Sequence, residues 1–226
     1  MYIAAFVVAG LATVPIIAVL GVTEVRGEGI GQTEILATIA ADVVITAILM
    51  WWLQRRHREW REAIVLPSID SQAIGFGLIG GLVLVPAVGV VSAVLEGILT
   101  AALDKKVVAP EQLSSGLSPL AAALAVVLAV VVAPFAEEFF FRGILFRTLR
   151  DRHGFWLAAF GSAVPFGLVH YVPSPWQDAV LLQGTMVFTG LGLAWIYDRR
   201  GTLTANVVAH MTFNLIGVVW ILFGSG

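Results

Sequence analysis

Cysteine is absent from the 226-residue sequence, and charged residues are scarce. The lack of cysteine excludes disulfides, thiol nucleophiles and thiolate metal ligands. Charged residues make up 12% of the chain and hydrophobic residues 59%, whereas a soluble domain has about 25% charged residues. The net charge is −2 and no basic tract is present, so nothing indicates a nucleic-acid partner. This composition predicts a polytopic membrane protein embedded in a lipid bilayer.

Apolar windows predict an all-α, polytopic transmembrane helical bundle of about seven to eight spans. The range arises because the third span might be two pieces, broken near Pro86 or Gly89. Met1–Leu20 lacks a positive n-region and is expected to be a retained span. We expect one integral membrane domain over residues 1–226, with spans at Tyr2–Val22, Glu34–Leu53, Gln72–Leu103, Ser118–Leu149, Phe155–Tyr171, Gln177–Tyr197 and Leu203–Phe223.

The distribution of lysine and arginine predicts the orientation of the bundle. If the N-terminus is cytoplasmic, ten of the 13 basic residues fall on cytoplasmic segments and three on outer segments. The positive-inside rule expects this asymmetry. The outer three are Arg26, Lys105 and Lys106, and the inner ten are Arg55, Arg56, Arg58, Arg61, Arg142, Arg147, Arg150, Arg152, Arg199 and Arg200.

The first half, residues 1–117, offers few polar features. Asp42 lies in the second predicted span and Glu96 in the third, where each is either structural or functional. Gly77 and Gly81 form a GxxxG pattern, which favours close packing of helices within the chain over dimerisation.

The second half, residues 118–226, carries two adjacent carboxylates and an arginine after an uncharged run, Leu120–Ala136. An ionisable group at bilayer depth costs about 2.5–3.5 kcal/mol and is therefore a functional candidate. On a helix, Glu138 and Arg142 share a face because they are four residues apart. Glu137 is rotated by about 100° from Glu138. One carboxylate is therefore expected to be held by an ion pair, while Glu137 projects into a cavity.

Three further polar residues lie at a similar depth on two other predicted spans. At about 1.5 Å per residue, Glu137 lies about 20 Å from its cytoplasmic turn and His170 about 24 Å from the same turn. His210 and Asn214 share a helix face and lie about 14 and 20 Å from theirs. Common depth favours one shared, hydrated site over scattered helix-packing contacts.

These residue types suit hydrolysis of an amide or ester by water, since no cysteine is present and no serine lies near this level. Glu137 is the expected general base, with His170 orienting the water. His210 and Asn214 are expected to stabilise the oxyanion, and Glu138 and Arg142 to hold the helix. A zinc site made by Glu137, His170 and His210 is the competing chemistry, although no HExxH motif is present.

Three motifs, Glu137-Glu138-x-x-x-Arg142, Phe166-x-x-x-His170 and His210-x-x-x-Asn214, resemble the CPBP family of intramembrane proteases. That family includes type II CAAX prenyl endopeptidases and bacteriocin-processing or immunity proteins. The resemblance covers about Ser118 to Phe223. It implies a membrane endopeptidase with a site opening toward the cytosol and the membrane.

The resemblance also implies a glutamate-based mechanism without a metal or cofactor, catalysed by Glu137, His170, His210 and Asn214. Glu138, Arg142 and Phe166 would support these residues. The substrate would be a peptide or protein at the membrane, with prenylated or CAAX-like tails as one class. Two alternatives stay open: a non-catalytic immunity or scaffold protein, and a small transporter.

Overall fold

The computed structural model describes residues 32–56, 70–110 and 118–223, and it contains no strand among them. The predicted all-α class is therefore confirmed for this part of the chain. Its main helices are α2 (Gln32–Arg56), α4 (Ser71–Leu103), α8 (Trp176–Arg200) and α9 (Leu203–Phe223). A further helical run, residues 119–169, lies between α4 and α8 and contains α5, α6 and α7.

Helix α4 is continuous over 33 residues, so the break expected near Pro86 or Gly89 was wrong. The side chain of Asp70 caps its N-terminus by accepting a hydrogen bond from the Gln72 N–H. Proline fits helical φ and removes only one N–H, a loss that membrane helices tolerate. Much of the helix surface is apolar and exposed, for example Ile79 and Val90, as a lipid-facing helix requires.

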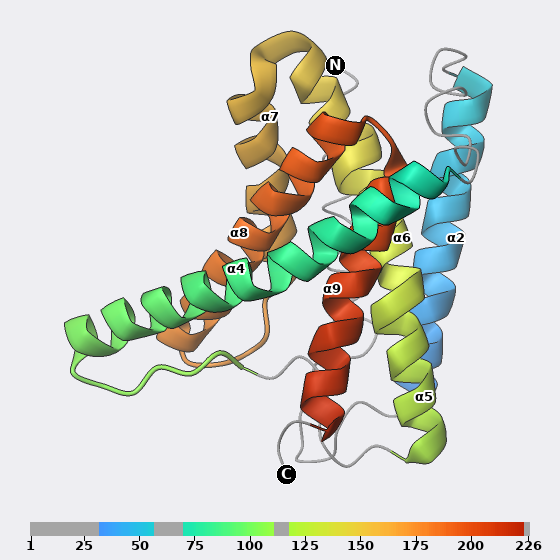
Figure 1. Ribbon diagram of the computed structural model, residues 1–226. Coiled ribbons are helices and arrows are strands. Elements are labelled where there is room, and N and C mark those ends of the chain that lie inside the picture. The colour runs from blue at the N-terminus through green and yellow to red at the C-terminus, as the bar shows by residue number, and fades with distance from the viewer. Residues whose placement is uncertain (1–31, 57–69, 111–117, 224–226) are drawn as a thin grey trace.

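The helical run 119–169 changes backbone geometry several times. It consists of α5 (Pro119–Val127), a π-helical turn η1 (Leu128–Val132), α6 (Ala133–Glu138), a second π-helical segment η2 (Phe139–Phe146) and α7 (Arg147–Val169). Gly154 interrupts α7 with φ 80° and ψ 177°, a conformation open to glycine only. The helix is kinked at this residue, and Figure 1 shows that α7 turns back on itself at its upper end.

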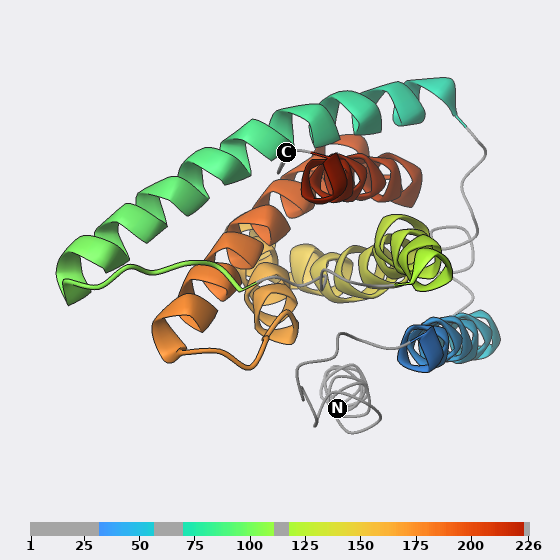
Figure 2. The same ribbon diagram turned by 90° about the horizontal axis from the view of Figure 1, so that it is seen from below.

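The helices form layers around the second half of the chain. Helix α4 packs against α8 and α9, and α7 packs against α8. Helix α2 contacts α5 and α6 on the other side. Figure 2 shows α4 along one side of the bundle and α2 along the opposite side, with the remaining helices between them. The layered arrangement encloses the segment that carries the two carboxylates.

The GxxxG pattern of α4 is explained by its contact with α9. A Cβ at Gly77 would clash with the carbonyl oxygen of Ala205, and a Cβ at Gly81 would lie 2.5 Å from that of Ala209. Small residues let two helix backbones approach closely. The predicted role in packing within the chain is therefore confirmed, and this contact fixes the part of α9 next to His210.

Four helices of the described residues are long and apolar enough to cross a membrane: Ser71–Leu103, Pro119–Val169, Trp176–Arg200 and Leu203–Ile221. These helices support an integral membrane protein. The count of seven to eight spans is not confirmed. The predicted fourth and fifth spans form one helical run with a kink at Gly154, and α2 has only a short apolar stretch, Ile39–Ile48. Tyr2–Val22 lies outside the described residues, and the orientation stays a prediction.

Candidate active site

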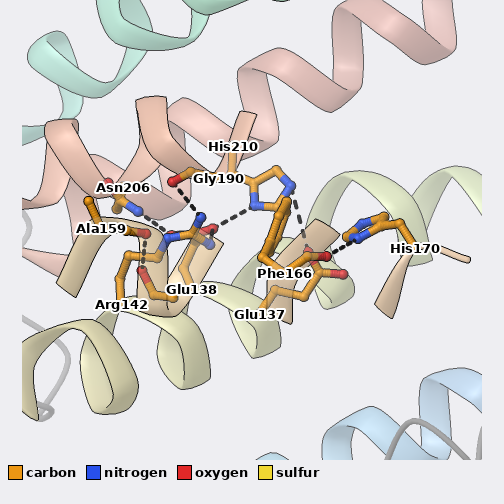
Figure 3. Close-up of polar contacts among 10 residues, drawn as sticks. Glu137, Glu138, Arg142, Ala159, Phe166, His170, Gly190, Asn206 and His210 are labelled. Carbon is orange, nitrogen blue, oxygen red and sulfur yellow. Dashed lines mark hydrogen bonds and ion pairs between the residues drawn. The ribbon is translucent and has the colours of Figure 1, made fainter. Parts of the chain in front are cut away.

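The two adjacent carboxylates of α6 lie in different surroundings. The side chain of Glu138 is fully buried, whereas that of Glu137 keeps 25% of its surface exposed. Successive residues of a helix point about 100° apart, so neighbours necessarily face different surroundings. In Figure 3 the Glu138 carboxylate points toward Asn206 of α9, whereas the Glu137 carboxylate lies on the side of His170.

Glu138 is the centre of a buried group that we call the sealed cluster: Glu138, Arg142 and Asn206. Its Oε1 accepts a hydrogen bond from Nη1 of Arg142 at 2.8 Å, so the ion pair expected from the i, i+4 spacing is present. Its Oε2 accepts a hydrogen bond from Nδ2 of Asn206 on α9. Buried charges need such partners, because an unpaired one is costly.

Arg142 ties the sealed cluster to two more helices. Its Nη2 donates to the carbonyl oxygen of Gly190 on α8 at 3.0 Å. Its guanidinium also lies over the Phe166 ring of α7, 4.5 Å from the centroid, which is a favourable cation–π distance. One arginine therefore joins η2, α7 and α8 around Glu138.

His210 connects the sealed cluster to Glu137. Its Nδ1 lies 2.9 Å from Oε1 of Glu138, and its Nε2 lies 3.8 Å from Oε2 of Glu137. A carboxylate paired with arginine can only accept, so Nδ1 of His210 carries the proton and donates to Glu138. In the neutral imidazole, Nε2 then has a free lone pair that faces Glu137.

His170 is the C-cap residue that follows α7, and its backbone angles are non-helical, φ −85° and ψ 20°. Its Nδ1 lies 2.7 Å from the carbonyl oxygen of Phe166, so this nitrogen donates and Nε2 is left unprotonated in the neutral ring. The Phe166 ring lies between the two imidazoles, with centroids 4.7 Å from His170 and 5.8 Å from His210. We call Glu137 and His170 the open cluster.

Asn214 makes a contact that its predicted role did not include. Its Nδ2 donates to the carbonyl oxygen of Ala129 at 2.7 Å. In the π-helical turn the Ala133 N–H bonds to the Leu128 carbonyl, five residues back. The next bond in that register would join Ala129 to residue 134, which is a proline and has no N–H. Asn214 therefore satisfies a carbonyl that Pro134 cannot, and its amide keeps a second N–H for other use.

The π-helical segments on both sides of α6 are a further feature of the site. Such segments are rare and occur frequently at functional sites. Here η1 and η2 directly flank the six-residue helix that ends in Glu137 and Glu138. They change the helical register before and after the carboxylates, which sets the directions in which the two acids point.

The competing zinc chemistry needs three ligands that lie close together. Within residues 32–56, 70–110 and 118–223, no three His, Asp or Glu side chains are grouped to hold a metal ion. In His210 and His170, Nδ1 has a protein partner, so Nε2 is the nitrogen left for other contacts. The zinc set of Glu137, His170 and His210 remains untested.

Asn206 is the residue that sequence reasoning missed. It lies four residues before His210, as Asn214 lies four after, so the pattern Asn-x-x-x-His-x-x-x-Asn marks one face of α9. Looking backward from His210 with the same spacing would have found it. Of the two acids of the first half, Asp42 is half-buried on α2, which packs against α6, and Glu96 is exposed on α4.

Comparison with known proteins gives a family match in the part of the chain that carries this site. Residues 119–216 match the family model described as type II CAAX prenyl endopeptidase Rce1-like. Over 98 residues the chain is 30% identical to the "Putative membrane peptidase YdiL" of Bacillus subtilis (strain 168), a match that covers 42% of this chain and 36% of that protein. No solved structure matches significantly. The resemblance expected from the three motifs is confirmed for this region.

Proposed function

We propose that this chain is an intramembrane endopeptidase that hydrolyses a peptide bond of a membrane-associated peptide or protein with an activated water molecule. The observation that carries the proposal is the exposed Glu137 carboxylate 3.8 Å from Nε2 of His210, with His170 across the Phe166 ring. Three separate helical segments supply these groups inside an apolar bundle. The match of residues 119–216 to a peptidase family supports the same reaction class.

Glu137 acts as the general base in the proposed mechanism. One proton of the water passes to Glu137 while the water oxygen bonds to the carbonyl carbon of the substrate. Nε2 of His170 accepts a hydrogen bond from the other O–H of the water and so orients it. This nitrogen is unprotonated in the neutral ring because Nδ1 carries the proton and donates to the Phe166 carbonyl. The C–N bond then breaks, and the proton on Glu137 passes to the leaving amine. General base catalysis of this kind contributes about 10²–10⁴ in rate.

The oxyanion that forms on the substrate needs hydrogen-bond donors. Asn214 can offer its second amide hydrogen, since the first is bonded to Ala129. His210 can donate from Nε2 when that nitrogen is protonated, because Nδ1 donates to Glu138. One such donor is typically worth about 10²–10³ in rate. The sealed cluster holds His210 in place for this step.

The substrate class and the orientation belong to the same proposal. The match to a type II CAAX prenyl endopeptidase model favours a lipidated or CAAX-like C-terminal peptide. The distribution of lysine and arginine supports an N-terminus and a site opening on the cytosolic side: without the buried Arg142, nine of the 12 remaining basic residues lie on that side in the proposed topology. Nothing in the site favours the scaffold or transporter alternatives.

The test is cleavage of fluorogenic reporter peptides by the protein in liposomes. Glu137→Gln keeps the size of the side chain but removes the base, so the rate should fall about 10²–10⁴-fold. Glu96→Gln, the same change at an exposed acid of α4, is the matched control and should retain activity. A rate for Glu137→Gln equal to the wild-type rate would overturn the proposal. Comparing farnesylated and unmodified CAAX peptides tests the substrate class.

A further inference from the structure

Asn206 is fully buried on α9, and its burial is unfavourable for its own side chain. Its Nδ2 donates to Glu138, but its Oδ1 has no hydrogen-bond partner among the described residues. A buried polar atom without a partner costs about 1–3 kcal/mol. An apolar residue would avoid this cost, so packing alone does not explain an asparagine at this position.

The contribution of Asn206 becomes clear from the carboxylate that it binds. Asn206 and His210 are one helical turn apart on α9, and they bind different oxygens of Glu138: Nδ2 of Asn206 binds Oε2, and Nδ1 of His210 binds Oε1. Two donors on two oxygens fix the plane of the carboxylate. Arg142 donates to Oε1, the same oxygen that His210 contacts, so Oε2 is held by Asn206.

The orientation of Glu138 determines the proton position on His210. With Oε1 held at 2.9 Å from Nδ1, the imidazole is in the tautomer that carries its proton on Nδ1. Its Nε2 then faces Glu137 as an unprotonated nitrogen. The hydrogen bond at one ring nitrogen commonly sets the protonation of the other, as with metal-bound histidines and catalytic triads.

We infer that Asn206 is a positioning residue that acts through Glu138 to hold His210 in the Nδ1–H tautomer, with Nε2 directed at Glu137. The link to catalysis rests on the proposed function, whereas the link to the tautomer does not. Asn206 itself does not reach the substrate, since its side chain is fully buried.

The experiment is ¹⁵N NMR of histidine-labelled full-length protein in nanodiscs, with the His210 signals assigned by their loss in His210→Gln. Wild-type His210 should show a protonated Nδ1 and an unprotonated Nε2 in its neutral form. Asn206→Leu should give a mixture of both tautomers, and Asn206→Ala serves as a second variant if the larger residue disturbs folding. Thr212→Val is the control, because the Thr212 hydroxyl donates to the Val208 carbonyl of its own helix.

Peptidase kinetics provide the second readout. Asn206→Leu should lower kcat about tenfold with little change in KM, as expected of a residue that orients a histidine from behind. An unchanged His210 tautomer in both Asn206 variants would overturn the inference, even if Glu137→Gln abolished cleavage. A shifted tautomer would support it, even if Glu137→Gln left cleavage intact and the proposed function failed.

Discussion

The sealed cluster and the open cluster begin with the same amino acid, at consecutive positions, yet they have opposite environments. Glu138 has three side-chain donors and no exposed surface, whereas Glu137 is a quarter exposed and lies 3.8 Å from Nε2 of His210. His210 lies between the two clusters, with Nδ1 at Glu138 and Nε2 toward Glu137. The comparison teaches that a rotation of about 100° along one helix is enough to separate a buried, ion-paired acid from a partly exposed one.

The largest expected effect tests the sealed cluster directly. Glu138→Ala leaves the Arg142 guanidinium buried without its carboxylate and should lower the free energy of unfolding by about 3–5 kcal/mol. Unfolding in mixed detergent and SDS micelles measures this change. The double variant Glu138→Met/Arg142→Met removes both charges and should recover much of the loss. A cost below about 1 kcal/mol for Glu138→Ala would mean that the pair behaves like an exposed one.

A smaller effect is expected where α4 supports α9 behind the sealed cluster. In Gly81→Ala the new methyl group would meet the Ala209 carbonyl and Thr212, so the helices must shift, at a cost of about 1–3 kcal/mol. Gly89→Ala is the matched control on the same helix, because nothing lies within 4 Å of its added carbon. Equal unfolding free energies for both variants would show that the close approach is not required.

The smallest effect is expected for an ion pair at the surface. Arg200 donates to Asp70 at 2.6 Å, but both side chains are about a third exposed. Solvent screens such pairs, so Arg200→Gln should change the unfolding free energy by less than about 1 kcal/mol. The same micelle assay compares it with Glu138→Ala, and a larger loss here would remove the contrast between buried and exposed pairs.

Much of the helical framework follows from the sequence alone. The predicted span Leu203–Phe223 coincides with α9, and Gln72–Leu103 misses the start of α4 by one residue. Long apolar runs ended by glycine or by polar residues determine these limits. The ion pair of Glu138 and Arg142 was also predictable, because an i, i+4 contact depends on the local helix geometry alone.

The remaining features depend on contacts between distant segments. The π-helical turn η1 ends two residues before Pro134, and Asn214 satisfies the carbonyl of its Ala129, which lies 85 residues earlier in the chain. No local pattern reports such a register change. Asn206 could be located by its spacing from His210, but its role could not be predicted, because that role depends on Glu138 of a distant helix facing it.

The backbone conformation of Gly154 restricts which amino acids can replace it. Glu137 lies 17 residues before it and His170 lies 16 residues after it, so the two arms of the reversal are nearly equal and return the histidine to the level of the acid. Nothing crowds this glycine, but its φ of 80° strains any residue with a Cβ. Every missense change of a glycine codon adds that carbon. A substitution at Gly154 would therefore change the relative positions of Glu137 and His170 from about 24 Å away along α7, without altering any chemical group of the site.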